Sequence, residues 1–462
     1  MCENINAEIA SGTISSVAEA VGYLNWTYFA RRMRSNPSYY GANSGSDEDV
    51  DFALLAVVKS TLAKLSTSGC VEYNEKDETG VLSPTPLGIA SCSYYLVHQT
   101  PWQMQFGVRE CRKIVQKELE SEGKQESPAE LSIFKRSVRV DEVSLAWLMY
   151  SLCNTHEFDE LPVRHNEEIL NEELSEAVKW GADTKALLTG KQGYQGPDTF
   201  SDPHCKAFLL IQAYLGRVRL PISDYVNDTK SVVENVPRLL AAMEYIASSD
   251  TTVAGSFDLI TQFARSRQYF ETRSLPTDNE MTQIELSEAI ARSLSEGAKG
   301  KKDAVRDIFQ LRSLSRKDAL TLLNKVNRAK GGNTNFNAIL DRLYSIPTVR
   351  LLEAKMLNQV DKSTGKSKGK LKLSLEAERA GERHKTSEVS LTILVGSLQQ
   401  GMLLSKASVR LSRIGKWTVT KDLEFDWNAA NADGGEEGGN VLVRLLLNEV
   451  RGFDQEVRVP LR

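Results

Sequence analysis

Cysteine is scarce in this chain, and its cysteines are not paired. The 462 residues contain six cysteines, at positions 2, 70, 92, 111, 153 and 205, with no Cys-x-x-Cys motif. This spacing argues against a zinc site and against a disulfide framework. It suits a protein that resides in a reducing compartment.

Long apolar segments are also missing. The longest apolar runs, Val143–Leu152 and Ala207–Leu215, are far shorter than the roughly 20 residues that span a bilayer. The N-terminus carries no charged-then-apolar signal peptide. We therefore expect no membrane partner.

A phosphate-binding loop is the third absence. Such a loop ends in Gly-Lys followed by Ser or Thr, and its backbone amides and lysine hold the phosphates. The nearest candidates, Thr189–Gln192 and Gly365–Lys368, lack the upstream glycine at the required spacing. We expect no catalytic residue, no bound cofactor and no metal in this chain, and no ATP hydrolysis by it.

The charge balance gives no global attraction to nucleic acid. The formal net charge is −4 and the isoelectric point is near 5.9, so any such binding has to be local. Residues 256–350 form the most basic globular stretch, with 16 Lys and Arg against 11 Asp and Glu.

The length predicts three to four domains. Residues 1–100 read as a winged helix with an N-terminal arm. We expect helices at Leu24–Arg34 and Val50–Leu65, and a wing hairpin flanked by Cys70–Tyr73 and Val81–Ser83. Trp26, Phe29 and Met33 recur at helical spacing and are expected to face the core.

Residues 101–140 are rich in Lys, Arg, Glu and Ser, and we interpret them as a charged linker or insert, either a charged surface helix pair or a partly disordered segment. Residues 141–300 then read as a helical bundle. One of its helices starts at Asp202-Pro203, with Asp as the N-cap, and runs to Arg219. Residues 301–346 suggest a small helix-loop-helix domain.

From residue 347 the apolar period changes to two, which predicts a β-sandwich over 347–462 that folds by itself. Seven strands are expected, at Thr348–Met356, Lys370–Glu376, Glu388–Leu394, Lys406–Leu411, Thr418–Trp427, Val441–Asn448 and Gln455–Val459. The predicted fold class is multidomain α+β.

Several segments resemble one family in the same order. They are Trp26–Tyr40, Pro86–Leu96, Asn154–Glu168 with its Pro-Val-Arg-His-Asn-Glu run, Ser201–Leu215 with Asp-Pro-His-x-Lys-Ala, and Leu446–Glu456. Together they are similar to the C-terminal unit of Ski-two-like RNA helicases, which carries Sec-sixty-three homology and follows the motor domains. The resemblance covers about nine-tenths of the chain.

The resemblance implies a winged helix, a helical bundle, a helix-loop-helix and a fibronectin-type sandwich. It implies a nuclear or cytoplasmic protein whose partners are single-stranded RNA and helicase motor domains or complex subunits. ATP and Mg would act only through a motor domain. In this family the bundle closes a ring around a single strand.

Six residues are candidates for contact with that strand. Arg164 stands at a helix entry, where its guanidinium can reach a phosphate or pair with Glu168. Lys206, Gln212 and Arg217 are expected on one helix, where Lys206 and Arg217 could follow one backbone. Arg265 and Arg267 precede Tyr269, a pairing that suits phosphate contact with stacking. For all six, the alternative is a structural ion pair or a solvated face.

Two further groups of residues, one of histidines and one of carboxylates, can be interpreted either as structural or as chemically active. His156, His165 and His204 with Cys205 could suggest a metal, but no zinc spacing matches, so capping or hydrogen bonding is favoured. Glu157, Asp159 and Glu160 lack a neighbouring nucleophile, so a solvated helix end is favoured over acid–base chemistry.

These patterns lead to two hypotheses of function. The first is the non-motor part of an RNA helicase, which guides single-stranded RNA and docks partner proteins. The second is a protein-interaction scaffold in a ribonucleoprotein or helicase complex, without nucleic-acid contact. The net acidity favours the scaffold, and the basic stretch favours strand contact.

Overall fold

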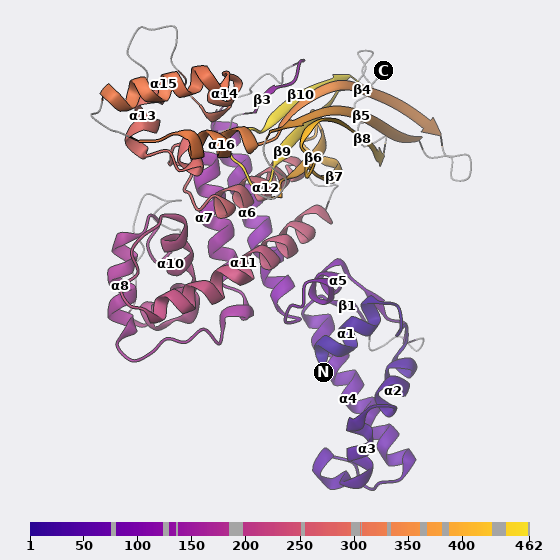
Figure 1. Cartoon of the computed structure of the whole chain (residues 1–462). Helices are drawn as coiled ribbons and strands as arrows, with labels where there is room; N and C mark the ends of the chain where they lie inside the picture. Colours follow the sequence, from indigo (N-terminus) through magenta and orange to yellow (C-terminus); the bar gives the residue numbers. More distant parts are fainter. Residues whose placement is uncertain are drawn as a thin grey trace.

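The computed structural model describes residues 1–74, 80–122, 129–134, 137–183, 197–250, 255–296, 305, 307–329, 334–360, 367–380, 388–426 and 440–460. The fold is α+β, with a winged helix at one end, a helical bundle in the middle and two β-sheets at the other end (Figure 1). The Gly-Lys pairs at 190–191 and 365–366 lie outside the described residues. No helix of the described ranges is long and apolar enough to cross a bilayer.

The winged helix has its own core, which includes Ile5, Leu54 and Met33. Its elements are α1 (Cys2–Ala10), α2 (Val17–Asn25), α3 (Tyr28–Ser35), η1 (Pro37–Tyr40), α4 (Asp47–Thr67), β1 (Val71–Glu72), β2 (Ser83–Pro84) and α5 (Pro86–Ser93). β1 and β2 pair antiparallel. Residues 75–79 of the expected wing turn lie outside the described residues.

The helix expected at Leu24–Arg34 is two helices. α2 ends at Asn25 and α3 begins at Tyr28, and the Thr27 hydroxyl closes the break by donating to the Leu24 carbonyl at 2.6 Å. The break shifts the helical phase. Met33 is therefore buried as predicted, but Trp26 is 93% exposed, and its expected place in the core was wrong.

Gly88 allows α5 to lie directly against the end of β1. A Cβ atom on Gly88 would stand 2.1 Å from the Cys70 carbonyl oxygen and 2.8 Å from Oδ1 of Asn6. Asn6 Nδ2 donates to the Gly88 carbonyl at 2.9 Å. Only a residue without a side chain fits this approach.

The bundle begins earlier than its sequence indicated. Its elements are α6 (Thr100–Glu122), α7 (Val138–Cys153), η2 (His156–Phe158), α8 (Glu167–Ala177), η3 (Pro197–Ser201), α10 (Pro203–Leu215), α11 (Asp224–Ser248) and α12 (Ser256–Glu271). α6 runs from the winged helix towards the sheets (Figure 1).

The interpretation of residues 101–140 as a linker or insert was wrong. Met104, Val108, Cys111 and Val115 of α6 are buried in the core of the bundle. They recur at helical spacing, and the charged residues between them hid that period. Further on, β3 (Ser132–Ile133) pairs with β10 (Gln455–Pro460), so this segment also contributes to a sheet.

Short helices connect the bundle to the strands. They are η4 (Glu280–Ile284), α13 (Glu288–Glu296), α14 (Ile308–Ser313), α15 (Arg316–Ala329) and α16 (Asn337–Ser345). Their apolar side chains, among them Met281, Ile308, Leu323 and Leu340, share one core with the sheets. The expected helix-loop-helix at 301–346 is therefore packed onto the strands.

The strands lie where the alternation predicted them. They are β4 (Thr348–Val360), β5 (Ser367–Arg379), β6 (Ser390–Ser397), β7 (Leu403–Arg410), β8 (Gly415–Asp426), β9 (Asn440–Leu447) and β10. One sheet has the order β4-β5-β8 and the other β3-β10-β9-β6-β7. Side chains of both sheets meet in a shared core.

The five-stranded sheet is covered on both faces, because successive residues of a strand point to opposite sides. In β6, Ile393 and Val395 belong to the core between the sheets, whereas Leu394 belongs to the core of the bundle. The Gly396 position lies against the Phe257 ring of α12, 2.4 Å from where a Cβ would stand. The strands therefore pack against the bundle as well as against each other, which makes folding of residues 347–462 by themselves less favourable than the sequence predicted.

Candidate nucleic-acid interface

Lys206 lies in a buried ion cluster between α8, α10 and α11. Its Nζ is 2.6 Å from Oε2 of Glu167 and 2.7 Å from Oδ2 of Asp228. It also donates to the Pro162 carbonyl at 2.6 Å and lies 4.6 Å from the centre of the Tyr225 ring. The side chain is fully buried, so it cannot contact a phosphate in this fold, contrary to the prediction.

Arg164 completes the same cluster. Its Nη1 is 2.8 Å from Oε1 of Glu167 and 2.7 Å from Oδ2 of Asp228. The expected partner was Glu168, one residue further on. Asn166, at φ 65°, turns the chain into α8, and Glu167 is the residue that points inward there. The Arg164 side chain is still 41% exposed.

At the centre of the cluster two cations face the carboxylates of Glu167 and Asp228, and Asp224 lies 3.8 Å from Nε of Arg164 at its exposed edge. Burial alone would raise the pKa of Glu167, but hydrogen bonds from Lys206 and Arg164 hold it below its ordinary value. Burial would likewise raise the pKa of Asp228, and the same two donors lower it. Both carboxylates are ionised at neutral pH, and the cluster is a structural joint between three helices.

Gln212 is also structural. Its Oε1 accepts from the backbone N–H of Trp180 at 2.8 Å, and its Nε2 donates to the Gly181 carbonyl at 2.8 Å. The side chain is buried. It satisfies the backbone beyond the end of α8 and is not available to a strand.

Arg217 was expected to share a helix face with Lys206, but it does not lie on that helix. α10 ends at Leu215, and Arg217 takes the left-handed conformation with φ 53°. The N–H of Val218 then donates back to the Ala213 carbonyl at 2.9 Å, which closes the helix end. The Arg217 guanidinium donates to the Arg273 carbonyl at 3.1 Å and remains exposed.

Arg265 and Arg267 fasten α12 to its neighbours. Arg265 is 2.5 Å from Asp141 of α7 and 2.6 Å from Asp454, which precedes β10. Burial raises the pKa of Asp454 to about 6, the negative charge of nearby Asp141 adds to this rise, and Arg265 and a hydrogen bond from Gln268 oppose it. Arg267 pairs with Glu244 of α11 at 2.8 Å. Glu244 also pairs with Lys406 of β7 at 2.6 Å, so both arginines lie in ion clusters that connect the bundle to the sheets.

The histidines form hydrogen bonds. His204 Nε2 is 3.1 Å from Asp159, and His156 Nδ1 is 2.9 Å from the same carboxylate. His204 Nδ1 lies 2.8 Å from the Cys153 carbonyl. Within the described residues no group of three or more His, Cys, Asp or Glu could hold a metal ion.

Glu157 is not simply a solvent-exposed residue at a helix end. It accepts from the Val97 N–H at 3.0 Å and from Arg238 Nη2 at 3.2 Å. Arg238 Nη1 also donates to the Tyr95 carbonyl at 2.7 Å. These contacts clamp the chain that leaves the winged helix onto α11.

An exposed row of side chains on α6 was missed from the sequence. Trp102 is 57% exposed and Phe106 63% exposed, and the basic residues Arg109, Lys113 and Lys117 continue at helical spacing on the exposed side. We call these five residues the α6 stripe. Their spacing of three and four was a signal, but it was passed over because the segment was read as an insert.

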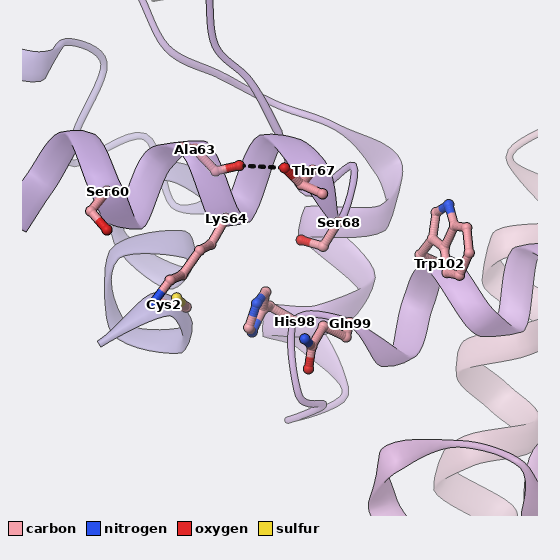
Figure 2. Close-up of a pocket in the computed structure, with 9 residues that line it drawn as sticks. All are labelled: Cys2, Ser60, Ala63, Lys64, Thr67, Ser68, His98, Gln99 and Trp102. Carbon is pink, nitrogen blue, oxygen red and sulfur yellow. Dashed lines mark hydrogen bonds between the residues drawn. The ribbon is translucent and has the colours of Figure 1, made fainter.

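The stripe begins at a cleft of about 740 Å³ between the winged helix and the bundle. Figure 2 shows the Lys64 side chain extending from α4 towards Cys2, with Trp102 on the neighbouring helix. The lining residues are Cys2, Ser60, Ala63, Lys64, Thr67, Ser68, His98, Gln99 and Trp102.

Comparison with known families agrees with this architecture. Residues 130–459 match the Sec63 Brl domain, and residues 1–75 match a winged helix-turn-helix domain. The first region covers the sheets and the bundle from α7 onwards, and the second covers the winged helix as far as β1; α6 lies between the two matches.

Several curated helicases are similar. The chain is 35% identical over 254 residues to the DExH-box ATP-dependent RNA helicase DExH14 of Arabidopsis thaliana, covering 55% of this chain and 10% of that protein. It is 31% identical over 282 residues to human activating signal cointegrator 1 complex subunit 3, covering 60% and 11%. For the RQC trigger complex helicase SLH1 of Saccharomyces cerevisiae the identity is 33% over 247 residues, covering 53% and 10%.

The chain thus spans about a tenth of the length of these relatives. The Sec63 Brl match alone covers well over half of the chain and reaches from β3 to β10. The chain belongs to the Sec63 Brl family, in the form that is joined to a winged helix and resembles Ski-two-like helicases.

Proposed function

We propose that this chain is the non-motor part of an RNA helicase, which guides single-stranded RNA and docks partner proteins. The observation that carries the proposal is the order of the two matched domains, a winged helix followed by a Sec63 Brl domain. The chain also aligns with about a tenth of the length of proteins that are named as helicases. The chain itself hydrolyses no ATP. ATP and Mg act through a motor domain, and the protein works in the nucleus or cytoplasm.

We further propose that the two sheets are a fibronectin-type sandwich. The strand order supports this reading. The first, second and fifth of the seven strands form one sheet (β4-β5-β8), and β7-β6-β9-β10 form the other. The fourth strand, β7, pairs with β6 rather than joining the first sheet, which distinguishes this arrangement from the constant-type immunoglobulin domain.

Partner docking is supported by the far end of the winged helix. Four large aromatic side chains are exposed there, namely Trp26, Tyr28, Tyr39 and Phe52. Asn25 donates to Asp51 at 2.6 Å, which holds the end of α2 beside α4. Trp and Tyr side chains are enriched among the residues that carry the binding energy of protein interfaces. The partner would be a motor domain or another subunit of the complex.

The scaffold without RNA is the second candidate. What favours it is that Lys206, Gln212, Arg265 and Arg267 are engaged within the fold, which leaves Arg164 and Arg217 as the exposed members of the predicted set. Fewer of the predicted basic residues are thus exposed and available to an RNA strand than the sequence suggested.

Fluorescence anisotropy with a labelled single-stranded RNA separates the two candidates. The strand-guiding function predicts binding that weakens as salt rises, because phosphate contacts release counterions. A duplex of equal length serves as the comparison. Absence of RNA binding at 50 mM salt, together with retained capture of the helicase motor region, would leave the scaffold as the function.

A further inference from the structure

We infer that the α6 stripe, together with the cleft at its start, is a binding track for single-stranded RNA. Bases would stack on Trp102 and Phe106, and phosphates would lie along Arg109 and Lys117, with Lys64 of the cleft at the near end. The inference rests on the proposed strand-guiding function and names the surface that performs it. None of the six residues predicted from the sequence belongs to it.

The first argument is the pairing of rings and charges on one helix. Trp102 and Phe106 stand one turn apart, about 6 Å along the axis at 1.5 Å per residue. That distance is comparable with the step between successive nucleotides of an extended strand. Surfaces that bind single strands combine such aromatic platforms with a row of cations.

The second argument is the availability of the charges. Among the described residues no ion-pair partner is found for Arg109 or Lys117, whereas Lys113 is 2.6 Å from Glu110. The nearby carboxylate of Glu118 lies 3.6 Å from Arg139. Two cations of the stripe are therefore free for phosphate, and Lys64 is a third at the cleft.

The third argument distinguishes RNA from a protein partner. The large apolar side chains that α6 exposes are both aromatic, Trp102 and Phe106, and its aliphatic residues Ile114 and Leu119 are partly covered. A protein-docking groove gains its affinity from burying contiguous apolar area. Isolated rings followed by cations suit stacking better than burial.

The fourth argument is placement. The cleft continues the stripe onto the winged helix, because Trp102 lines it at one side and Lys64 of α4 extends into it from the other (Figure 2). His98 is held at the cleft by Glu3, 3.1 Å away. A strand on α6 would therefore pass from the sheet end of the bundle to the winged helix.

The test is anisotropy of a labelled single-stranded RNA with the full chain and matched variants. The double variant Trp102→Ala/Phe106→Ala should bind about 10- to 100-fold more weakly, since each lost stack weakens binding about 5- to 150-fold alone and the losses partly overlap. The control Ile169→Ala removes an exposed apolar side chain from α8 and should leave affinity unchanged. Trp102→Phe should keep most of the affinity.

The charges are tested by salt. Arg109→Gln/Lys117→Gln should flatten the slope of log affinity against log salt by about 1.4, at roughly 0.7 for each phosphate contact. The control Lys59→Gln lies on α4 and should leave the slope unchanged. Tryptophan emission should fall on addition of RNA in the wild type and stay constant in Trp102→Phe.

The outcomes separate the inference from the function on which it rests. RNA binding that survives the ring and charge variants would overturn the track and leave strand guiding intact. No RNA binding by the wild type would overturn both. Loss of motor-region capture with unchanged RNA affinity would make the stripe a protein-docking face and overturn the inference.

Discussion

The ammonium nitrogen of Lys206 lies 2.6 Å from Oε2 of Glu167, and the lysine side chain is fully buried. A cation in this position has exchanged its hydration for protein oxygens, so its removal leaves a carboxylate without its partner. Lys206 therefore stabilises the fold, and its buried side chain has no direct role in RNA binding.

We expect Lys206→Met to lower the free energy of unfolding by about 3 kcal/mol, since breaking a buried pair typically costs about 3–5 kcal/mol and Arg164 keeps part of the compensation. Urea unfolding followed by circular dichroism measures it. The control is Lys230→Met, because Lys230 is exposed and 3.9 Å from Glu234, and its change should stay below about 0.5 kcal/mol. Similar losses in both variants would contradict the cluster's structural role.

Acidification from pH 7 to pH 4.5 should stabilise the protein through Asp454. Its folded pKa is raised to about 6, above the roughly 3.9 of an unfolded aspartate. The folded state therefore binds a proton in this window that the unfolded state does not, and stability rises as the pH falls. Urea midpoints across this range should rise in the wild type.

Asp454→Asn should remove most of the rise in urea midpoint between pH 7 and pH 4.5. The control Asp198→Asn, which changes an exposed carboxylate, should keep that rise. Below about pH 4 the trend reverses in both, because the lowered pKa values of Glu167 and Asp228 contribute stability that is lost on protonation. A flat wild-type profile between pH 7 and 4.5 would show that Asp454 stays ionised.

Gly88→Ala should destabilise the junction of β1 and α5 strongly. The added Cβ would stand 2.1 Å from the Cys70 carbonyl oxygen, and backbone atoms can give way only by moving α5 off the strand. Overpacking of this kind costs about 1–3 kcal/mol or more. Gly22→Ala is the matched control, because nothing lies within 4 Å of its Cβ position, and it should stabilise α2 by about 0.5–1 kcal/mol. Thermal unfolding and limited proteolysis compare the two.

A fragment of residues 345–462 should fail to fold cooperatively by itself. Without α12 it would expose the sheet face that carries Leu394, Leu403, Leu442 and Leu446. A fragment of residues 256–462 restores that helix and should be more soluble and better packed. Dye binding to exposed apolar surface and the cooperativity of thermal unfolding distinguish them. A sharp unfolding transition of the shorter fragment would contradict this expectation.

The sequence predicted the local structure of the strands well because period-two alternation marks the core side of each strand directly. Leu371, Leu373 and Leu375 show this in β5, where each is buried. In β6 and β9 the alternation is lost, because both faces are covered. The consecutive apolar residues Ile393–Val395 in β6 and Leu445–Leu447 in β9 were the available signal that the sheet has a second neighbour.

The candidate site was predicted less well, and the reason is physical. Lys206 and Arg164 carry the charges that phosphate needs, but buried carboxylates need the same charges. Whether Lys206 binds phosphate or pairs with buried carboxylates depends on Asp228, which lies 22 residues from Lys206 in the chain. No periodicity reports such a contact, whereas the rings of Trp102 and Phe106 could have been found once α6 was assigned as a helix.

The joint between bundle and sheets has a consequence for synthesis of the protein. Arg265 finds Asp454 only after another 189 residues have been made, and β3 waits still longer for β10. At about 5–20 residues per second the arginine's wait lasts roughly ten to forty seconds. During that time the nascent chain presents β3 without its partner strand, Arg265 with only Asp141 of its two carboxylates, and the uncovered side of α12. Ribosome-associated chaperones therefore have a defined window and a defined surface on which to act.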